Sequence, residues 1–266
     1  MSAAFDKWRK ERLPELKARE FSCSSIKNVT LLAYFFWPEE IFDERFDEIE
    51  FAFLSAYETF GLMPSTLVVN RESEKTAAFA RRYGARVIVE PHLDCRDGVK
   101  SLCLESISRL HTRFDTEYVL TLQNDGMPLR PGLEKFLGKY DYIGAPWPGH
   151  TAWWDLYPYP KYGVGNGGFS LRSHRICEAA AEAYATLSRF IPYWQPIFGD
   201  DVFYAKFLPF FSRRFRHEFK IAPIEVAAEF SIEGPTRYHV KPPLGFHRGG
   251  FDEYVKRFGV DHKTKV

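Results

Sequence analysis

Cysteine is scarce in this sequence and follows no motif. The chain has 266 residues and four cysteines, namely Cys23, Cys95, Cys103 and Cys177. No two of them form a Cys-x-x-Cys pair, which argues against a zinc ribbon and against a framework of disulfides. This cysteine usage favours a reducing compartment, and we expect a cytoplasmic protein.

Long apolar runs and an excess of one charge are also missing. The longest apolar run, VTLLAYFFW at residues 29–37, is too short to span a bilayer, and the first 17 residues contain no apolar segment of signal-peptide length. Lysine and arginine total 36 against 35 acidic residues, so the net charge of +1 gives no reason to expect a nucleic-acid partner. We expect a soluble or peripherally attached protein, and a small charged ligand stays open.

Aromatic residues, by contrast, are abundant. Phenylalanine, tyrosine and tryptophan make up 17% of the chain, with 25 Phe among them. Rings in such numbers fill a core and also supply flat faces that stack on sugars or bases in a cleft. We expect most of them in the core.

Strands and helices are predicted to alternate from Val29 to Asp125. The predicted strands are NVTLLAYFF (28–36), STLVVN (65–70), ARVIVE (85–90) and EYVLTLQND (117–125). The predicted helices between them cover residues 42–61, 73–84 and 98–111. This alternation predicts an α/β fold, Rossmann-like in this half, with a mostly parallel central sheet and right-handed crossovers. No Gly-x-Gly-x-x-Gly follows the first strand, which argues against a dinucleotide oxidoreductase.

After Asp125 the chain is rich in Gly, Pro and aromatics, which indicates loops and short strands. A helix is predicted to resume at residues 173–190, with Ser173 as its N-cap. We therefore expect one domain over residues 1–266, in which residues 27–125 bind a donor and the loop-rich residues 126–250 bind an acceptor.

The fourth predicted strand ends on two amides and an acid. The run VLTL (119–122) suits a buried strand, and Gln123, Asn124 and Asp125 follow at its carboxyl end, where open α/β sheets bind ligands. Alternatively, Asn-Asp-Gly-Met-Pro is only a turn, with Asn and Asp bonding their own backbone and Gly126 supplying positive φ.

The stretch GVGNGGFSLRS (163–173) surrounds Asn166 with glycines and leads into a short predicted strand. No lysine follows with Walker spacing, so this is not a P-loop. Dense glycines let a backbone approach a ligand or turn sharply, and Arg172 has the reach and charge for a phosphate or carboxylate. The alternative is a tight hairpin with a structural arginine.

Two further motifs carry titratable groups. In FGDDVF, Asp200 and Asp201 open a predicted helix, and neighbouring carboxylates raise one another's pKa, as suits a general base. Helix capping alone would explain one of them. In PPLGFHRGG, His247 is a loop-borne histidine that can donate to a phosphate or bind a metal, although a lone histidine is usually structural.

In this order and at these separations, YVLTLQNDG, YDYIGAPW, GVGNGGFSLRS, FGDDVF and PLGFHR resemble the bacterial DUF5672 proteins. The resemblance, which covers roughly Val29 to Arg248, implies a glycosyltransferase related to nucleotide-sugar enzymes of the GT-A fold. It implies a GT-A-like fold and hexosyl transfer from a nucleotide-sugar, most simply a UDP-sugar, to a glycan or lipid-linked acceptor in polysaccharide biosynthesis.

The resemblance also implies roles for residues. GT-A enzymes end this strand on an Asp-x-Asp motif that holds a divalent cation on the donor diphosphate; here Asp125 matches the last acid and Gln123 replaces the first. His247 would complete a manganese or magnesium site, and Asp201, beside Asp200, would be the base that deprotonates the acceptor hydroxyl. The donor-binding candidates are Asn70, Gln123, Asn124, Asp125, Arg172 and Arg248. The candidates for the acceptor and sugar pocket are Trp147, Asn166, Gly167, Gly168 and Phe169.

The leading hypothesis is therefore an inverting glycosyltransferase with an aspartate base, and Glu233 in FSIEG is the next candidate base if the Asp pair only caps a helix. The first alternative, a catalytically weak nucleotide-sugar or glycan-binding module, is favoured by Gln123. The second is a nucleotidyltransferase, but FFWPEEIFDER stands where such enzymes carry a Gly-rich basic loop.

Two segments carry hypotheses about access and location. The loop PWPGHTAWWDLYPYPKYG (146–163) is a candidate lid whose Trp147, Trp153 and Trp154 stack on sugar faces, with packing as the alternative. The stretch VFYAKFLPFFSRRFRHEF (202–219) mixes phenylalanine and arginine, a pattern compatible with an anionic membrane surface. The alternative there is a core helix ended by Pro209 and followed by a solvated basic turn.

Overall fold

The first half of the chain alternates strands and helices, as the hydrophobic pattern predicts. The protein is described here by a computed structural model that covers residues 2–93, 99–147, 163–190, 199–209 and 219–259. Its first strands are β1 (Val29–Phe35), β2 (Ser65–Val69), β3 (Arg86–Val89) and β4 (Tyr118–Leu122). The helices between them are α2 (Glu39–Phe60), α3 (Glu74–Tyr83) and α4 (Val99–Arg109), and the 3-10 turn Leu110–Thr112 follows α4.

Local signals explain where these helices begin and end. Ser73 caps α3 by accepting a hydrogen bond from Thr76 N, and Gly84 ends it in the left-handed conformation at φ 66°. Gly61 ends α2 at φ 82°. Ser173 Oγ accepts from Ile176 N and so caps α6 (His174–Phe190), the helix predicted at residues 173–190.

The central sheet has six strands in the order β3-β2-β1-β4-β9-β6, where β6 is Tyr142–Ile143 and β9 is Ser170–Ser173. The first four strands are parallel, which confirms the predicted parallel core, whereas β9 runs antiparallel to both β4 and β6. The whole sheet is therefore mixed.

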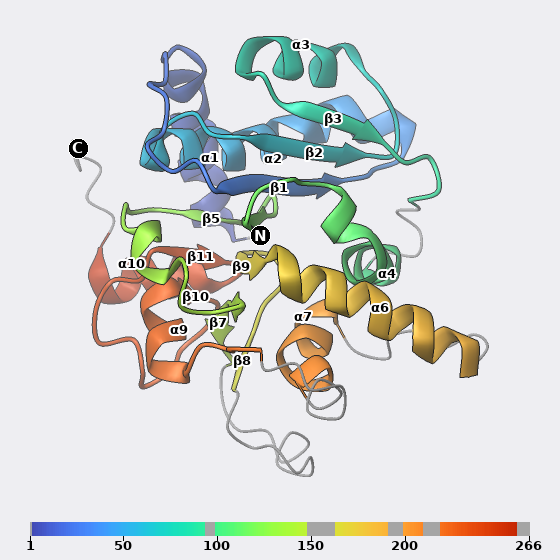
Figure 1. Cartoon of the computed structure of the whole chain (residues 1–266). Helices are drawn as coiled ribbons and strands as arrows, with labels where there is room; N and C mark the ends of the chain where they lie inside the picture. The colour runs from blue at the N-terminus through green and yellow to red at the C-terminus, as the bar shows by residue number, and fades with distance from the viewer. Residues whose placement is uncertain (1, 94–98, 148–162, 191–198, 210–218, 260–266) are drawn as a thin grey trace.

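The strand order reverses beside β1. The chain steps outward from β1 to β2 and β3 and then returns to the other side of β1 as β4. Right-handed crossovers of this kind place α2 and α3 on one face and α4 on the other, and α4 lies beside α6 (Figure 1). The carboxyl ends of β1 and β4 therefore form the topological switch point, where such sheets bind ligands.

A second, small sheet lies next to this point. It has the order β10-β11-β5, formed by β5 (Gly126–Pro128), β10 (Ser231–Ile232) and β11 (Gly245–His247). Because β11 pairs antiparallel with β5, His247 lies opposite Gly126, immediately after the end of β4. The pair β7 (Ala145–Pro146) and β8 (Val164–Gly165) and the helix α9 (Ile224–Phe230) lie close by (Figure 1).

Helix α1 (Ala3–Lys17) was not predicted from the sequence, and neither was α10 (Gly250–Phe258). Ser2 caps α1 by accepting from Phe5 N. The Phe5 ring lies 6.4 Å from that of Phe51 in α2 and 5.4 Å from that of Phe246 in β11. Residues from both predicted halves of the chain thus share one aromatic cluster.

Among the described residues, most aromatic rings belong to the core, as expected. Phe35, Phe42 and Phe46 pack between β1 and α2, with centroids 4.9 Å apart for Phe35 and Phe42 and 5.7 Å apart for Phe35 and Phe46. In the described part of the chain, no helix is both long and apolar enough to cross a membrane.

Candidate functional site

The residues that end β4 form a two-residue turn that carries the acid. Gln123 N donates to Gly126 O and Gly126 N donates to Gln123 O, at 3.2 and 3.0 Å, which leaves Asn124 and Asp125 at the apex. The turn interpretation is thus right in part, although Gly126 is not among the residues with positive φ. The turn holds the Asp125 side chain, 20% exposed, at the carboxyl edge of the sheet.

Four polar side chains converge beside this turn. His247 Nε2 lies 2.9 Å from Gln123 Oε1 and 3.4 Å from Asp125 Oδ1, and His247 Nδ1 lies 3.3 Å from Glu233 Oε1. Burial alone would lower the pKa of His247, but the hydrogen bonds and charges of Asp125 and Glu233 outweigh it and raise that pKa. Burial would likewise raise the pKa of Asp125, but His247 lowers it overall.

The glycines of GVGNGGFSLRS make room for these side chains. A Cβ at Gly168 would collide with His247 Nε2 and Gln123 Oε1, and a Cβ at Gly167 would collide with Asp200 Oδ1. Between the two groups stands Asn166, a buried non-glycine residue at φ 75°. The loop therefore lies between two groups of side chains and contacts both. One is the cluster around His247, and the other is the Asp200–Asp201 pair.

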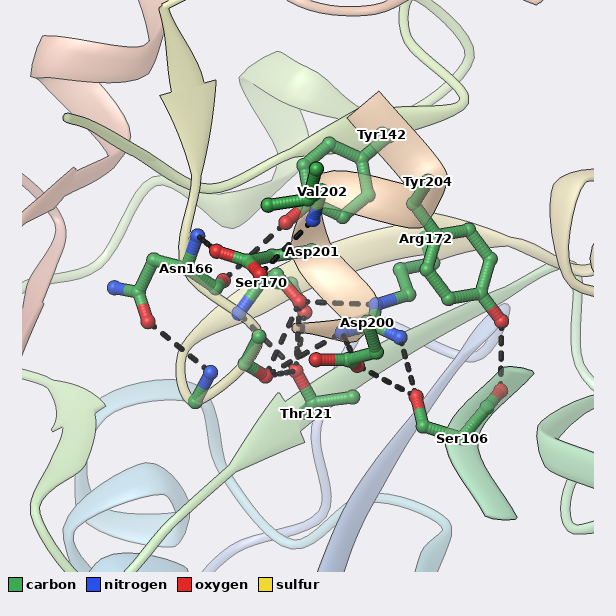
Figure 2. Close-up of polar contacts among 12 residues, drawn as sticks. Ser106, Thr121, Tyr142, Asn166, Ser170, Arg172, Asp200, Asp201, Val202 and Tyr204 are labelled. Atoms are coloured by element: carbon green, nitrogen blue, oxygen red, sulfur yellow. Dashed lines mark hydrogen bonds and ion pairs between the residues drawn. The ribbon is translucent and has the colours of Figure 1, made fainter. Parts of the chain in front are cut away.

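Asp201 is a partly buried carboxylate that faces no cation among its hydrogen-bond partners. Its Oδ2 accepts from Asn166 N at 2.7 Å and its Oδ1 accepts from Val202 N at 2.9 Å (Figure 2). Burial and then the charge of Asp200 raise the pKa of Asp201, although these two backbone donors oppose the shift. A carboxylate in this state is suited to accept a proton.

Asp200 has a different environment, although it is the next residue. Figure 2 shows its carboxylate held by Arg172 and Ser106: Arg172 Nη2 donates to Asp200 Oδ2 at 2.8 Å, and Ser106 Oγ donates to the same oxygen at 2.7 Å. Arg172 is 1% exposed and lies 4.4 Å from the Tyr204 ring centroid. Asp200 and Arg172 form a buried ion pair, so we leave Arg172 out of the donor site proposed below.

Three buried polar atoms near the Asn166 loop have no hydrogen-bond partner in the described residues. They are Asn166 Nδ2, Ser231 Oγ and His247 Nδ1. Ser231 lies opposite Gly245 in the pairing of β10 with β11, and Glu233 and His247 follow two residues later along these two segments. Buried polar groups are normally satisfied. Glu233 lies within reach of His247 Nδ1, so Asn166 Nδ2 and Ser231 Oγ are the two atoms for which a ligand would supply the partner.

The other donor candidates have partners within the protein. Asn70 bonds the backbone of Trp37, with Trp37 N donating to Oδ1 at 3.4 Å and Nδ2 donating to Trp37 O at 3.1 Å. Asn124 Nδ2 donates to the buried Glu48 of α2 at 2.7 Å. Arg248, at φ 51° and 61% exposed, points its Nη1 to within 3.9 Å of Glu233 Oε1. Of these residues, Arg248 retains the most exposed charge.

The pocket candidates divide in a similar way. Phe169 is fully buried and stacks on Phe230 with centroids 5.1 Å apart, which makes it a core residue. Trp147 packs over Gly165 and has the ammonium of Lys206 5.2 Å from its ring centroid. Trp153 and Trp154 lie outside the described residues, as do Arg213, Arg214 and Arg216 of the basic stretch.

The two buried cysteines of the described residues, Cys103 and Cys177, supply no reactive thiolate. Burial raises the pKa of Cys103 to about 12 and that of Cys177 to about 12, so both remain thiols at neutral pH. Both lie close enough to the Arg172–Asp200 pair to interact electrostatically with it, yet neither offers a thiolate nucleophile.

Gln123, Asp125 and His247 fit a hard divalent cation. Neighbouring ligands of an octahedral ion with bonds of about 2.1 Å lie about 3 Å apart, which matches the 2.9 and 3.4 Å separations from His247 Nε2. Among the described residues no group of three His, Cys, Asp or Glu side chains is arranged to hold a metal ion by itself. An ion here would therefore use the Gln123 amide oxygen and oxygens from substrate or water.

Sequence reasoning missed the partners that fix the site. Ser106 stands in the middle of α4 and Glu48 in the middle of α2, at positions that no local motif distinguishes. Glu233 had a local signal, an acid directly after a short strand, but its contact with His247 depends on the pairing of β10 with β11.

Solved structures with a similar fold are glycosyltransferases. The galactosyltransferase LgtC, solved with donor and acceptor sugar analogues, matches with a TM-score of 0.50 at 14% identity over 83% of this chain and 87% of its own. Core-mannan synthase A of Aspergillus fumigatus, in its Mn/GDP form, gives 0.47 at 10% identity, with 71% of each chain covered. GlyE of Streptococcus pneumoniae gives 0.45 at 11% identity over 84% of this chain, which spans 55% of GlyE. The match to LgtC shows that the protein has the GT-A fold.

A comparison with curated proteins found no match. A scan against protein families found one, over residues 86–247, to the family described as "Protein of unknown function (DUF5672)". The matched segment extends from β3 to His247 and includes the β4 turn, the Asn166 loop and the Asp200–Asp201 pair. Because it spans more than half of the sequence, the chain belongs to the DUF5672 family.

Proposed function

We propose that this protein is a glycosyltransferase that moves a sugar from a nucleotide-sugar donor to a hydroxyl of a glycan or lipid-linked acceptor. One observation carries the proposal: a carboxylate suited to accept a proton, Asp201, and a cation-binding group, Gln123, Asp125 and His247, flank the Asn166 loop at the switch point of a GT-A sheet. Residues 27–125 then bind the nucleotide, and residues 126–250 bind the acceptor.

In the proposed reaction, the acceptor hydroxyl oxygen attacks the anomeric carbon while the bond from that carbon to the donor diphosphate breaks. The hydroxyl proton passes to the Asp201 carboxylate, and the nucleoside diphosphate leaves. Asp201 can accept the proton because its two hydrogen bonds come from backbone amides rather than from a neutralising cation. Attack from the face opposite the leaving group inverts the anomeric configuration.

Gln123, Asp125 and His247 would hold the divalent cation, manganese or magnesium. When bound, the cation supplies positive charge to the leaving diphosphate. Arg248 adds a permanent positive charge at the same edge, since its backbone N donates to Asp125 O at 2.8 Å. Asn166 Nδ2 and Ser231 Oγ, both unpaired and buried, are assigned to hydroxyls of the bound sugars.

A nucleotide-sugar or glycan-binding module without transfer activity is the second candidate. It is favoured by the amide of Gln123, which is a weaker neutral ligand than a carboxylate. Incubation with UDP-sugars or GDP-sugars, manganese and a hydroxyl acceptor separates the two. Release of nucleoside diphosphate above the rate without protein supports the transferase, whereas binding in calorimetry without release supports the module.

Asp125→Ala is expected to abolish cation-assisted donor binding and to lower turnover by orders of magnitude, because it removes the acid of the β4 turn. Folding should be nearly unchanged, since the Asp125 backbone keeps its hydrogen bond to Arg248 N. Calorimetry with nucleotide and manganese measures the effect, and Asp115→Ala, an exposed acid just before β4, is the control. Full activity of Asp125→Ala, or undiminished wild-type activity in EDTA, would remove the cation site.

We also propose a cytoplasmic location with peripheral membrane contact through residues 202–219. Phe203 is buried in the core, so the described part of this stretch offers little apolar surface, and the contact would be electrostatic. Each basic residue near an anionic membrane contributes about 1 kcal/mol. We expect flotation with anionic liposomes at low salt and release at high salt. Absence of binding at low salt would indicate a soluble acceptor.

A further inference from the structure

We propose that Glu233 is a positioning residue that orients His247 for the cation. Its carboxylate would accept the Nδ1–H of the imidazole, which leaves the Nε2 lone pair directed at Gln123 and Asp125. The inference rests on the proposed function, because it assigns a role within the same cation site.

The strand pairing places Glu233 beside His247. Strands β10 and β11 are parallel, with Ser231 opposite Gly245 and Ile232 opposite Phe246, so the next residues, Glu233 and His247, are neighbours. Glu233 Oε1 lies 3.3 Å from His247 Nδ1. Nδ1 makes no hydrogen bond of normal geometry within the described residues, so Glu233, 3.3 Å away, is placed to accept its proton without competition from another bonded acceptor.

The imidazole ring has little freedom to choose another orientation. His247 is 4% exposed in its side chain. Gly168 packs against Nε2 and Cδ2, so closely that a Cβ there would collide with both, and Gly126 packs against Cδ2. The two ring nitrogens point in opposite directions, toward Glu233 on one side and toward Gln123 and Asp125 on the other.

Hydrogen-bond chemistry then decides which nitrogen carries the proton. A neutral imidazole has one donor and one acceptor nitrogen, and a carboxylate beside Nδ1 requires the donor there. The lone pair of Nε2 consequently faces Gln123 Oε1 and Asp125 Oδ1, which are acceptors as well. With the proton on Nδ1, all three lone pairs are free to face a bound cation. Carboxylate partners of this kind fix the tautomer of metal-binding histidines and raise their basicity.

The position of Glu233 argues against a direct role as ligand or base. It contacts the ring on the nitrogen that faces away from Gln123 and Asp125. Its second neighbour is the Arg248 guanidinium, with Nη1 3.9 Å away.

Titration with Mn2+ alone, followed by electron paramagnetic resonance of the free ion, tests the inference. Glu233→Met removes the acceptor at similar size and should weaken Mn2+ binding by about 10–100-fold. Glu233→Gln keeps a neutral acceptor oxygen and should fall between Met and wild type. The control is Glu229→Gln. Glu229 is an exposed acid of α9, the helix before β10, and pairs with Lys135, so this variant should bind Mn2+ like wild type. Circular dichroism checks that each variant is folded. If Glu233→Met does not fold, the Mn2+ affinity of the isosteric Glu233→Gln variant still tests the inference.

Each further outcome contradicts either this inference or the cation site itself. If Asp125→Ala loses Mn2+ while both Glu233 variants bind like wild type, Glu233 does not position His247, and the proposed function stands. If turnover falls equally in both Glu233 variants at unchanged Mn2+ affinity, Glu233 is a base and the positioning role is wrong. If the wild-type protein binds no Mn2+, the positioning role is also wrong. Release of nucleoside diphosphate in the absence of metal then decides whether the proposed glycosyltransferase function stands.

Discussion

Asp201→Asn is expected to reduce sugar transfer by a factor of about 100 or more and to leave nucleotide-sugar affinity almost unchanged. Asparagine keeps the size of the side chain and an oxygen for one of the two backbone donors, Asn166 N or Val202 N, but it cannot accept the hydroxyl proton. Transfer rates and donor binding are measured separately. Asp43→Asn, a change at an exposed aspartate in α2, controls for the loss of one negative charge.

The pH profile provides an independent readout of the same residue. Transfer needs the ionised carboxylate, and the pKa of Asp201 is raised by burial and by the charge of Asp200. Activity should therefore fall as the pH drops through a pKa above the ordinary aspartate value of about 3.9. The residual activity of Asp201→Asn should lack this acidic limb.

The product of the reaction can contradict the assignment. An inverting mechanism requires a new linkage with the anomeric configuration opposite to that of the donor, which NMR of the product reads directly. A retained configuration would rule out the base mechanism. If Asp201→Asn transfers sugar at the wild-type rate, Asp201 is not the catalytic base, and the Asp200–Asp201 pair serves only to cap the helix.

Arg172→Met should lower the free energy of unfolding by about 3–5 kcal/mol, the largest stability effect that we expect. The substitution leaves Asp200 as a buried carboxylate with Ser106 as its remaining side-chain donor. Urea unfolding measures the change. Arg81→Met removes an exposed partner of Glu74, with side chains 66% and 84% exposed, and should cost no more than about 1 kcal/mol.

A double substitution separates the ion pair from packing. Arg172→Met combined with Asp200→Asn should cost less than the sum of the two single changes, because neither residue then leaves an unpaired buried charge. Strict additivity would mean that the pair does not interact. A loss below about 1 kcal/mol for Arg172→Met alone would show that the guanidinium is dispensable to the fold.

The parallel part of the sheet was predictable because its signals are local. The apolar runs of β1, β2 and β4 and the amphipathic pattern of α2 follow from burial of one or both faces of an element. The N-cap Ser173 and the C-terminal Gly61 mark helix ends through hydrogen bonds and φ angles within a few residues. The position of Asp125 at the ligand edge follows from the same order of elements.

Helices α1 and α10 have local signals at their ends, such as Ser2 before α1 and Gly259 after α10, but their packing partners are distant in the sequence. Their stability comes from contacts between the two termini of the chain, such as Ser2 Oγ donating to Asp252 Oδ1 at 2.7 Å, and from the rings of Phe5 and Phe251, 5.2 Å apart. Residues so far apart in sequence leave no periodic pattern that reveals their contact.

The sequence by itself determined the α/β class, the order of the elements and the acids and histidine available for chemistry, because each depends on neighbours along the chain. The family resemblance assigned the base role to Asp201, but only the tertiary structure supplied a physical difference between the two acids, since Arg172 and Ser106 reach Asp200 from β9 and α4. The tertiary structure also brings Asn124 into a hydrogen bond with Glu48 and brings Glu233 next to His247. The pKa and the role of a carboxylate depend on the charges and donors around it in space, and local sequence does not specify those partners.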